Sequence, residues 1–152
     1  MEFFAGLHPK IVHFPIALFV IYTFMEIFGV LFKKDAYTKS AHLILSFGIL
    51  SAVAAVLTGN QAYETAKLIF GLQQKFPNEI IALHEQFATV TLWYFLLLFI
   101  FRTYIVMKKK LTKTFLIIFS VLGLIGCYFL YLTGNYGAEL VYKYGIGIKI
   151  LQ

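Results

Sequence analysis

Charged residues are scarce in this chain of 152 residues. They make up 13% of the sequence, and only seven of them are acidic, whereas about 25% of an average soluble domain is charged. Hydrophobic residues reach 61%, and the mean hydropathy is +0.82. This balance excludes an ordinary soluble domain and predicts a protein whose solvent is the lipid bilayer.

Cysteine is nearly absent as well, since Cys127 is the only one in the chain. A single thiol excludes a disulfide within the chain and a thiolate metal motif. Because Cys127 lies inside an apolar run, we interpret it as a helix-packing residue. The first ten residues also lack the basic segment and the cleavage site of a secretory signal peptide, so we expect the first apolar stretch to remain as a helix.

The sequence contains several long runs of apolar residues. Four of them approach the roughly 20 residues that a helix needs to cross the hydrocarbon core, and they cover residues 11–32, 41–57, 80–106 and 115–132. We expect Pro77 and Asn78 to form a stop and N-cap before the third run. The predicted fold class is therefore an all-α membrane protein, a single domain over 1–152 with a bundle of four transmembrane helices.

Basic residues gather at two places, beside the ends of the first and third runs. They are Lys33, Lys34, Lys39, Arg102, Lys108, Lys109, Lys110 and Lys113. By the positive-inside rule these places face the cytoplasm, which puts both termini on the outer side of a bacterial inner membrane. The basic residues behind the net charge of +6 thus serve to orient the protein in the membrane. We therefore exclude nucleic acid as a partner.

The ends of the second and fourth runs repeat a short motif. Leu-Thr-Gly-Asn occurs at 57–60 and again at 132–135, an offset of 133 − 58 = 75. His13 at the start of the first run corresponds to His84 at the start of the third. We interpret the pattern as a duplicated helical hairpin whose copies are related by an axis along the membrane normal. The short match is also typical of helix ends, where Gly and Asn are ordinary residues.

The duplication divides the domain into three parts. Its copies span about 8–64 and 79–139, and a C-terminal cap covers 136–152. The cap contains the tyrosine-rich and glycine-rich segment 136–147, in which the glycines predict turns with unusual backbone angles. We expect this cap to lie at the outer headgroup level.

Three of the four histidines, His8, His13 and His84, fall near the outer face in this topology. His13 and His84 lie at equivalent places in the two hairpins, so the axis can direct both imidazoles into one cavity. Two facing imidazoles suit a b-type haem, with Phe14, Phe87 and Trp93 lining its slot.

Two alternatives remain open for the histidines. His8, His13 and His84 could instead bind zinc or copper, with Glu85 or Glu139 adding an oxygen ligand. They could equally be interfacial residues that hydrogen-bond backbone carbonyls and lipid headgroups, in which case no cofactor is bound.

Glu26 and His42 belong to the cytoplasmic half, one on each arm of the first hairpin. An acidic group inside an apolar helix is costly, so Glu26 and His42 form a candidate proton or quinone site, and we expect them to pair with each other. Glu26 follows His13 by 13 residues, which at about 100° per residue puts the two on different helix faces. The simpler interpretation is that Glu26 has a structural role and forms a hydrogen bond that links two helices.

Two segments carry a family resemblance: H-P-K-I-V-H-F-P-I-A-L at 8–18 and E-L-V-Y-K-Y-G-I-G-I at 139–148. They resemble domain-of-unknown-function family 2231, and the resemblance spans nearly the whole chain. It implies a four-helix bacterial membrane protein, and fusions of this domain to c-type cytochrome modules imply a redox setting by association. The tail departs from the family pattern, since Ala138 replaces a usual glycine and Tyr144 stands where a histidine is common.

The leading functional prediction is a small b-type cytochrome that transfers electrons in the membrane, with His13 and His84 as axial ligands of the haem. Its expected partners are the lipid bilayer and a quinone or a c-type cytochrome, and the chain could form an oligomer. The other hypotheses are a histidine-based metal-binding membrane protein and a non-catalytic assembly subunit. The sequence assigns no catalytic residue, and a redox subunit is favoured over a stand-alone enzyme.

Overall fold

The computed structural model describes residues 2–70 and 76–147, and within these ranges the chain is helical and contains no strand. The helices are α1 (Glu2–Ile11), α2 (His13–Phe32), α3 (Asp35–Phe70), α4 (Asn78–Met107) and α5 (Lys113–Tyr142). Four segments are long and apolar enough to cross a membrane, α1 and α2 together forming the first from Phe4 to Phe32. The predicted all-α, four-span membrane fold is therefore confirmed.

The first span is interrupted where α1 meets α2. Pro15 has no N–H to donate to the carbonyl of Ile11, so the helical hydrogen-bond ladder loses a bond there. The chain still turns helically, because the amide of Val12 donates to the carbonyl of His8 at 3.1 Å. Residues 2–10, which precede the first apolar run, are thus part of a helix.

The helices extend further than the apolar runs suggested. α3 continues to Phe70, and its 36 residues correspond to about 54 Å of helix, well beyond a hydrocarbon core of about 30 Å. α5 continues to Tyr142, so the first part of the predicted cap is helix. Beyond it, Gly145 and Gly147 adopt positive φ angles of 69° and 88°, which confirms the turns predicted from these glycines. Residues 148–152 of the cap lie outside the described residues.

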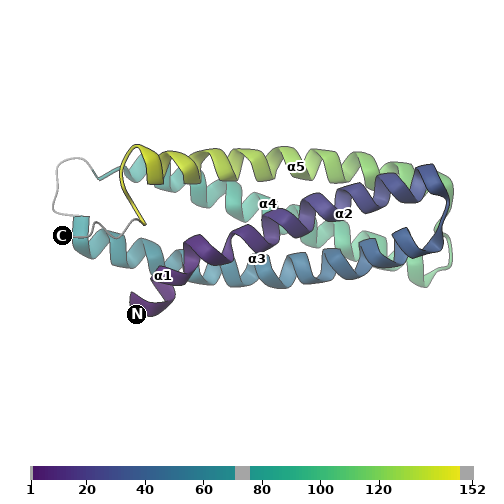
Figure 1. The fold of residues 1–152 in the computed structure, drawn as a ribbon, viewed down its shortest axis with the longest axis horizontal. Helices are drawn as coiled ribbons and strands as arrows, with labels where there is room; N and C mark the ends of the chain where they lie inside the picture. The colour runs from purple at the N-terminus through teal and green to yellow at the C-terminus, as the bar shows by residue number, and fades with distance from the viewer. Residues whose placement is uncertain (1, 71–75, 148–152) are drawn as a thin grey trace.

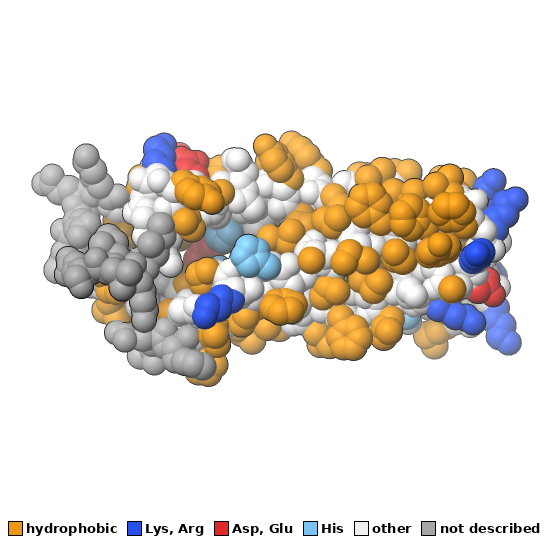
Figure 2. Space-filling model, viewed as in Figure 1, with side chains coloured by type: hydrophobic (Ala, Val, Ile, Leu, Met, Phe, Trp, Pro, Cys, Tyr) orange, Lys and Arg blue, Asp and Glu red, His pale blue; other side chains and the backbone are white. Residues whose placement is uncertain are grey.

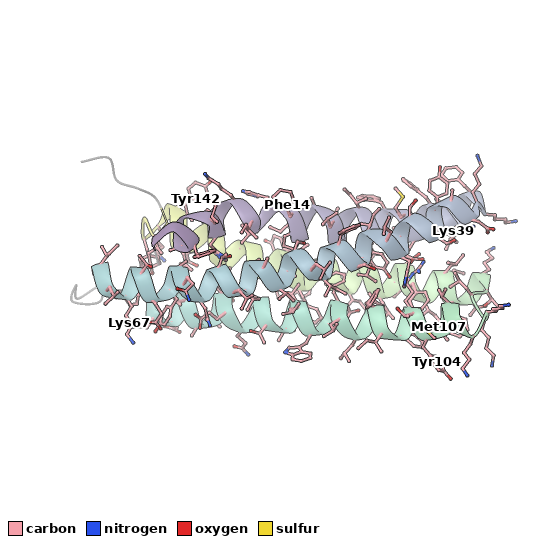
Figure 3. All side chains as sticks on the ribbon, turned by 90° about the horizontal axis from the view of Figure 1, so that it is seen from below. Phe14, Lys39, Lys67, Tyr104, Met107 and Tyr142 are labelled. Atoms are coloured by element: carbon pink, nitrogen blue, oxygen red, sulfur yellow. The ribbon has the colours of Figure 1, made fainter. Side chains whose placement is uncertain are left out.

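The bundle has two chemically different ends. Both termini lie at one end (Figure 1), which we call the terminal end. The loops after α2 and α4 lie at the other, where Lys39 and Met107 are seen in Figure 3. Basic side chains gather there, beyond the largely hydrophobic surface between the two ends (Figure 2), and we call it the lysine-rich end. This hydrophobic surface indicates that the bundle spans the bilayer. That the lysine-rich end faces the cytoplasm stays a prediction.

In the core of the bundle, aromatic rings pack directly against glycines. α2 packs between α3 and α5, and α4 packs against the same two helices. In the middle Phe19 of α2 and Phe95 of α4 stack with ring centroids 3.8 Å apart and planes 4° from parallel. A Cβ on Gly48 would lie 2.7 Å from the Phe19 ring, and one on Gly126 would lie 2.5 Å from the Phe95 ring. Only glycine therefore allows these helices to approach so closely. The duplication of the hairpin stays a prediction.

Candidate functional site

Two histidines meet at the terminal end of the bundle. The rings of His8 on α1 and His84 on α4 have centroids 6.4 Å apart, and their planes are inclined by 81°. Both side chains are partly buried. We call them the histidine pair. It joins two helices whose backbones do not otherwise approach each other in the described part of the chain.

His8 is held by the middle of α3. Its Nδ1 lies 3.0 Å from the carbonyl oxygen of Ala55 and 3.3 Å from the hydroxyl of Thr58. Gly59 lets the ring lie directly against the helix, because a Cβ at this position would be 3.0 Å from Cε1 of His8. Thr58 and Gly59 belong to the first Leu-Thr-Gly-Asn motif, so the imidazole of His8 packs directly on this motif.

His84 is held by α5 in a parallel manner. Its Nδ1 lies 3.0 Å from the carbonyl oxygen of Thr133, in the second Leu-Thr-Gly-Asn motif. The Thr133 hydroxyl is in turn 3.0 Å from the hydroxyl of Thr91, which ties α5 to α4. Gly137 lets this ring approach, since a Cβ there would lie 3.1 Å from Cε1 of His84. The two imidazoles therefore have the same kind of support from two different helices.

These contacts fix the tautomer of both rings. A carbonyl oxygen only accepts hydrogen bonds, so Nδ1 of His8 and Nδ1 of His84 must each carry a proton and donate it. In a neutral imidazole the other nitrogen, Nε2, then keeps its lone pair. A backbone carbonyl on Nδ1 is the usual support of a metal-ligating histidine, because it orients the ring and raises its basicity.

His13, the other histidine of the predicted site, does not join the pair. It is exposed at the start of α2. Its predicted role as an axial ligand stays a prediction, but the ring that the structure brings to His84 is that of His8. His8 precedes the first apolar run of the sequence, yet it lies within helix α1 and its ring is held by α3.

The aromatic residues expected around a haem are distributed differently. Phe14 and Trp93 are 62% and 58% exposed, so they face outward from the bundle and are not lining residues. Phe87 stacks on Tyr136 with ring centroids 5.5 Å apart, which places this pair between α4 and α5. Of the three, only Phe87 contributes to packing between helices.

The carboxylates proposed as extra metal ligands do not complete a metal-binding group with the histidine pair. Glu85 is exposed, and Glu139 accepts a hydrogen bond from Nζ of Lys143 at 2.9 Å, an interaction that also raises the pKa of Lys143. Within residues 4–69 and 76–147, whose side chains are described, no three His, Cys, Asp or Glu residues form a group that could hold a metal ion. The histidine pair supplies two nitrogens and no further protein ligand in this part of the chain.

A second polar group lies deep in the lysine-rich half. Glu26 and Arg102 are 0% and 1% exposed, and Nε of Arg102 donates to Oε1 of Glu26 at 2.5 Å. The predicted pairing of Glu26 with His42 is therefore wrong, since the carboxylate binds a cation from α4. Arg102 had been counted among the loop charges, and it is instead buried in the bundle. Glu26 is buried whereas His13 is exposed, which confirms that they occupy different helix faces.

Sequence reasoning missed the histidine pair and the role of Arg102, although signals for both exist. His8 and His84 are separated by 84 − 8 = 76 residues, close to the 75 of the repeated motif, whereas His13 and His84 are separated by 71. Arg102 stands inside the run 80–106 and not at its edge, and a lone cation inside a span calls for an acidic partner such as Glu26.

Comparison with known proteins identifies the chain at the level of a family. No curated protein and no solved structure is significantly similar to it. One family model matches almost the whole chain, over residues 5–150, and is described as a predicted membrane protein family, DUF2231. The bundle of four apolar spans agrees with that description. The chain belongs to the DUF2231 family of membrane proteins.

Proposed function

We propose that this protein is a small b-type cytochrome that binds haem between His8 and His84 and transfers electrons at the terminal end of the bundle. The observation that carries the proposal is the histidine pair itself. Two imidazoles from distant parts of the chain lie with ring centroids 6.4 Å apart, and each Nδ1 donates to a backbone carbonyl. Bis-histidine ligation of haem needs two nitrogens with free lone pairs, one on each side of the iron.

The separation of the rings fits this ligation. Two metal–nitrogen bonds of about 2.0 Å, together with the distance of about 1.1 Å from each nitrogen to its ring centre, put the centres about 6.2 Å apart. The observed distance between the centroids of His8 and His84 is 6.4 Å. The distance between the two ring centres therefore fits a haem that His8 and His84 would hold between them.

Few helices crowd the pair. Within the described residues, the backbone of α1 approaches α3 and α2 but neither α4 nor α5. Gly59 and Gly137 let the two imidazoles lie directly against α3 and α5. A haem between the rings would therefore be bordered by α1 and α4, whose backbones do not contact each other in the described part of the chain.

Haem is favoured over a bare metal ion because of the number of ligands. Zinc in proteins takes three or four protein ligands, and the histidine pair has two, with no third ligand close by in the described part of the chain. A haem needs only the two axial nitrogens, since the macrocycle supplies the other four. The zinc or copper alternative is therefore the less supported reading of this site.

The residues of the site have distinct tasks in this proposal. His8 and His84 bind and orient the group, while the carbonyls of Ala55 and Thr133 retain the Nδ1 protons and keep both Nε2 lone pairs free. Bound haem supplies one-electron oxidation and reduction. A quinone in the bilayer or a c-type cytochrome at the terminal end is the proposed exchange partner. Glu26 is separated from this site by the stack of Phe19 and Phe95 and serves a different purpose.

The proposal is tested by spectroscopy of the purified protein after expression with ample haem. Wild-type protein should show a Soret band that shifts and sharpens on reduction. His8→Ala and His84→Ala should each lose the low-spin spectrum or the haem, because one axial nitrogen is removed.

Matched controls come from the two other histidines. His13→Ala and His42→Ala should keep the wild-type spectrum, since His13 is exposed and His42 lies in the lysine-rich half. Loss of haem in His13→Ala with retention in His8→Ala would restore the ligand pair predicted from the sequence. Wild-type protein that binds copper or zinc without a Soret band would overturn the cytochrome proposal.

A further inference from the structure

Among the side chains that the structure describes, three buried polar atoms in the lysine-rich half make no hydrogen bond. They are the hydroxyl of Tyr22, Oε2 of Glu26 and Nδ1 of His42. Tyr22 and Glu26 are 0% exposed, and Arg102 beside them is 1% exposed. We call Tyr22, Glu26, His42 and Arg102 the polar cluster. It lies within the membrane-spanning segments, where no bulk water reaches unpaired groups.

The cluster is assembled from neighbouring turns of three helices. Tyr22 and Glu26 lie one turn apart on α2, and the hydroxyl of Tyr22 is close to both Glu26 and Arg102. On α3, His42 follows Thr38 by one turn, and the carbonyl of Thr38 accepts from Nη2 of Arg102 at 2.8 Å. The ring of His42 stacks on Phe99, one turn from Arg102 on α4, with centroids 5.2 Å apart. The unpaired atoms are therefore grouped around a single guanidinium.

Unpaired polar atoms at this depth are costly. A buried group without a hydrogen bond has given up its bonds to water and gained none in return, so three such groups together destabilise the folded protein. Buried water commonly satisfies such groups when two to four polar partners surround it. The cluster has a complementary set: Glu26 Oε2 accepts, the Tyr22 hydroxyl both donates and accepts, and His42 Nδ1 does either according to its tautomer.

The cluster lies near a pocket at one end of the bundle. This pocket of about 200 Å³ opens at the lysine-rich end, lined by Gly29, Val30, Lys33, Lys34, Asp35, Thr38, Lys113 and Leu116. Thr38 is part of its wall and also holds Arg102 through its carbonyl. Thr38 therefore connects the wall of the pocket with the guanidinium.

The other side of the cluster is closed by aromatic rings. Tyr22 packs against the edge of Phe95, with ring centroids 6.5 Å apart. Phe95 stacks on Phe19 at 3.8 Å, and both rings are fully buried against Gly48 and Gly126. This tightly packed layer separates the cluster from the terminal half.

We propose that the polar cluster is an internal water-binding site, reached from the pocket at the lysine-rich end and closed toward the histidine pair by Phe19 and Phe95. Water bound there bridges Tyr22, Glu26 and His42 around Arg102. It also gives the Glu26 carboxylate a partner for proton exchange with the lysine-rich side of the membrane. The site is independent of haem binding, because none of its residues touches His8 or His84.

Hydroxyl-radical labelling of the whole protein in lipid nanodiscs tests this site. Radicals formed by radiolysis of bound water label side chains next to that water, even inside a membrane. For each residue the labelling rate in the folded protein is divided by that in protein unfolded in detergent. Tyr22 should retain roughly tenfold more of its unfolded rate than Phe19, which is equally buried but lies in the closed aromatic layer. Equal protection of Tyr22 and Phe19 would overturn the proposal.

A double variant supplies the matched control. Replacing both members of the ion pair, Glu26→Leu with Arg102→Met, removes the groups that hold the water while keeping the cluster apolar. Tyr22 labelling should then fall to the level of Phe19. Labelling of Tyr22 that stays at the wild-type rate in a folded double variant would contradict water binding by this cluster. If the double variant fails to fold, the comparison of Tyr22 with Phe19 in wild-type protein decides alone.

Discussion

The buried ion pair allows a quantitative prediction about stability. Arg102→Met removes the cation that binds Glu26 and also frees the carbonyl of Thr38. Breaking a buried pair by removing one partner costs about 3–5 kcal/mol. We expect a loss of this size at pH 7, because Glu26 is 0% exposed and no other cation lies against it among the described side chains.

The pH dependence of this loss follows from the chemistry of the orphaned carboxylate. Glu26 can enter the folded variant in its neutral form, and protonating an exposed glutamate costs about 3.7 kcal/mol at pH 7 but only about 1 kcal/mol at pH 5. The stability that Arg102→Met loses therefore cannot greatly exceed the cost of protonating Glu26. Because that cost falls as the pH falls, the loss of stability falls with it. Arg102→Met should be clearly less destabilised at pH 5 than at pH 7, relative to wild type at each pH.

The assay is reversible unfolding in mixed detergent micelles, arranged as a double-mutant cycle with Glu26→Gln. The double variant Glu26→Gln with Arg102→Met should recover most of the stability lost by either single variant, since no buried charge remains. Lys143→Met is the control: it breaks the exposed pair with Glu139 and should leave stability almost unchanged. A loss below about 1 kcal/mol for Arg102→Met at pH 7 would refute the reasoning.

Three further predictions follow from the packing and the loops. Gly126→Ala should destabilise the bundle by about 1–3 kcal/mol in the same unfolding assay, because its Cβ would lie 2.5 Å from the Phe95 ring, whereas Gly134→Ala, with open space around it, should be close to neutral. Gly137→Leu should displace the His84 ring and lower the haem content without unfolding the helices by circular dichroism; unchanged content would argue against His84 as a ligand. A cysteine introduced at Lys110 should resist an impermeant thiol reagent in intact cells and react after permeabilisation, and labelling in intact cells would reverse the predicted orientation.

The global fold could be predicted because the bilayer imposes a simple rule on the sequence. Four apolar runs and the placement of the lysines were enough for the helices and for the grouping of both termini at one end. The lengths were underestimated where helices continue beyond the hydrocarbon core. Hydropathy drops after Leu57 in α3, yet the helix continues to Phe70, because backbone hydrogen bonds and helix propensity do not end at the membrane boundary.

The candidate sites could be predicted only in part, because side-chain pairing depends on helix rotation and offset. The sequence indicated a histidine cluster at the terminal end, but His13 and His8 lie five residues apart and therefore on different sides of the chain's helical path. Which of them meets His84 depends on the position of α1 against α3, and this is set by the close contact at Gly59. Similarly, Glu26 was recognised as unusual, but its partner lies 76 residues away on α4.

Near-infrared magnetic circular dichroism of the oxidised wild-type protein tests the central claim most directly, because the position of the charge-transfer band identifies the axial ligands of a low-spin haem. The proposal predicts one haem b per chain with the band of two neutral histidine ligands, as expected from Nδ1 protons retained by the carbonyls of Ala55 and Thr133. Protein that is folded but contains no haem after haem-replete expression, or haem whose band indicates a ligand other than two histidines, would contradict it.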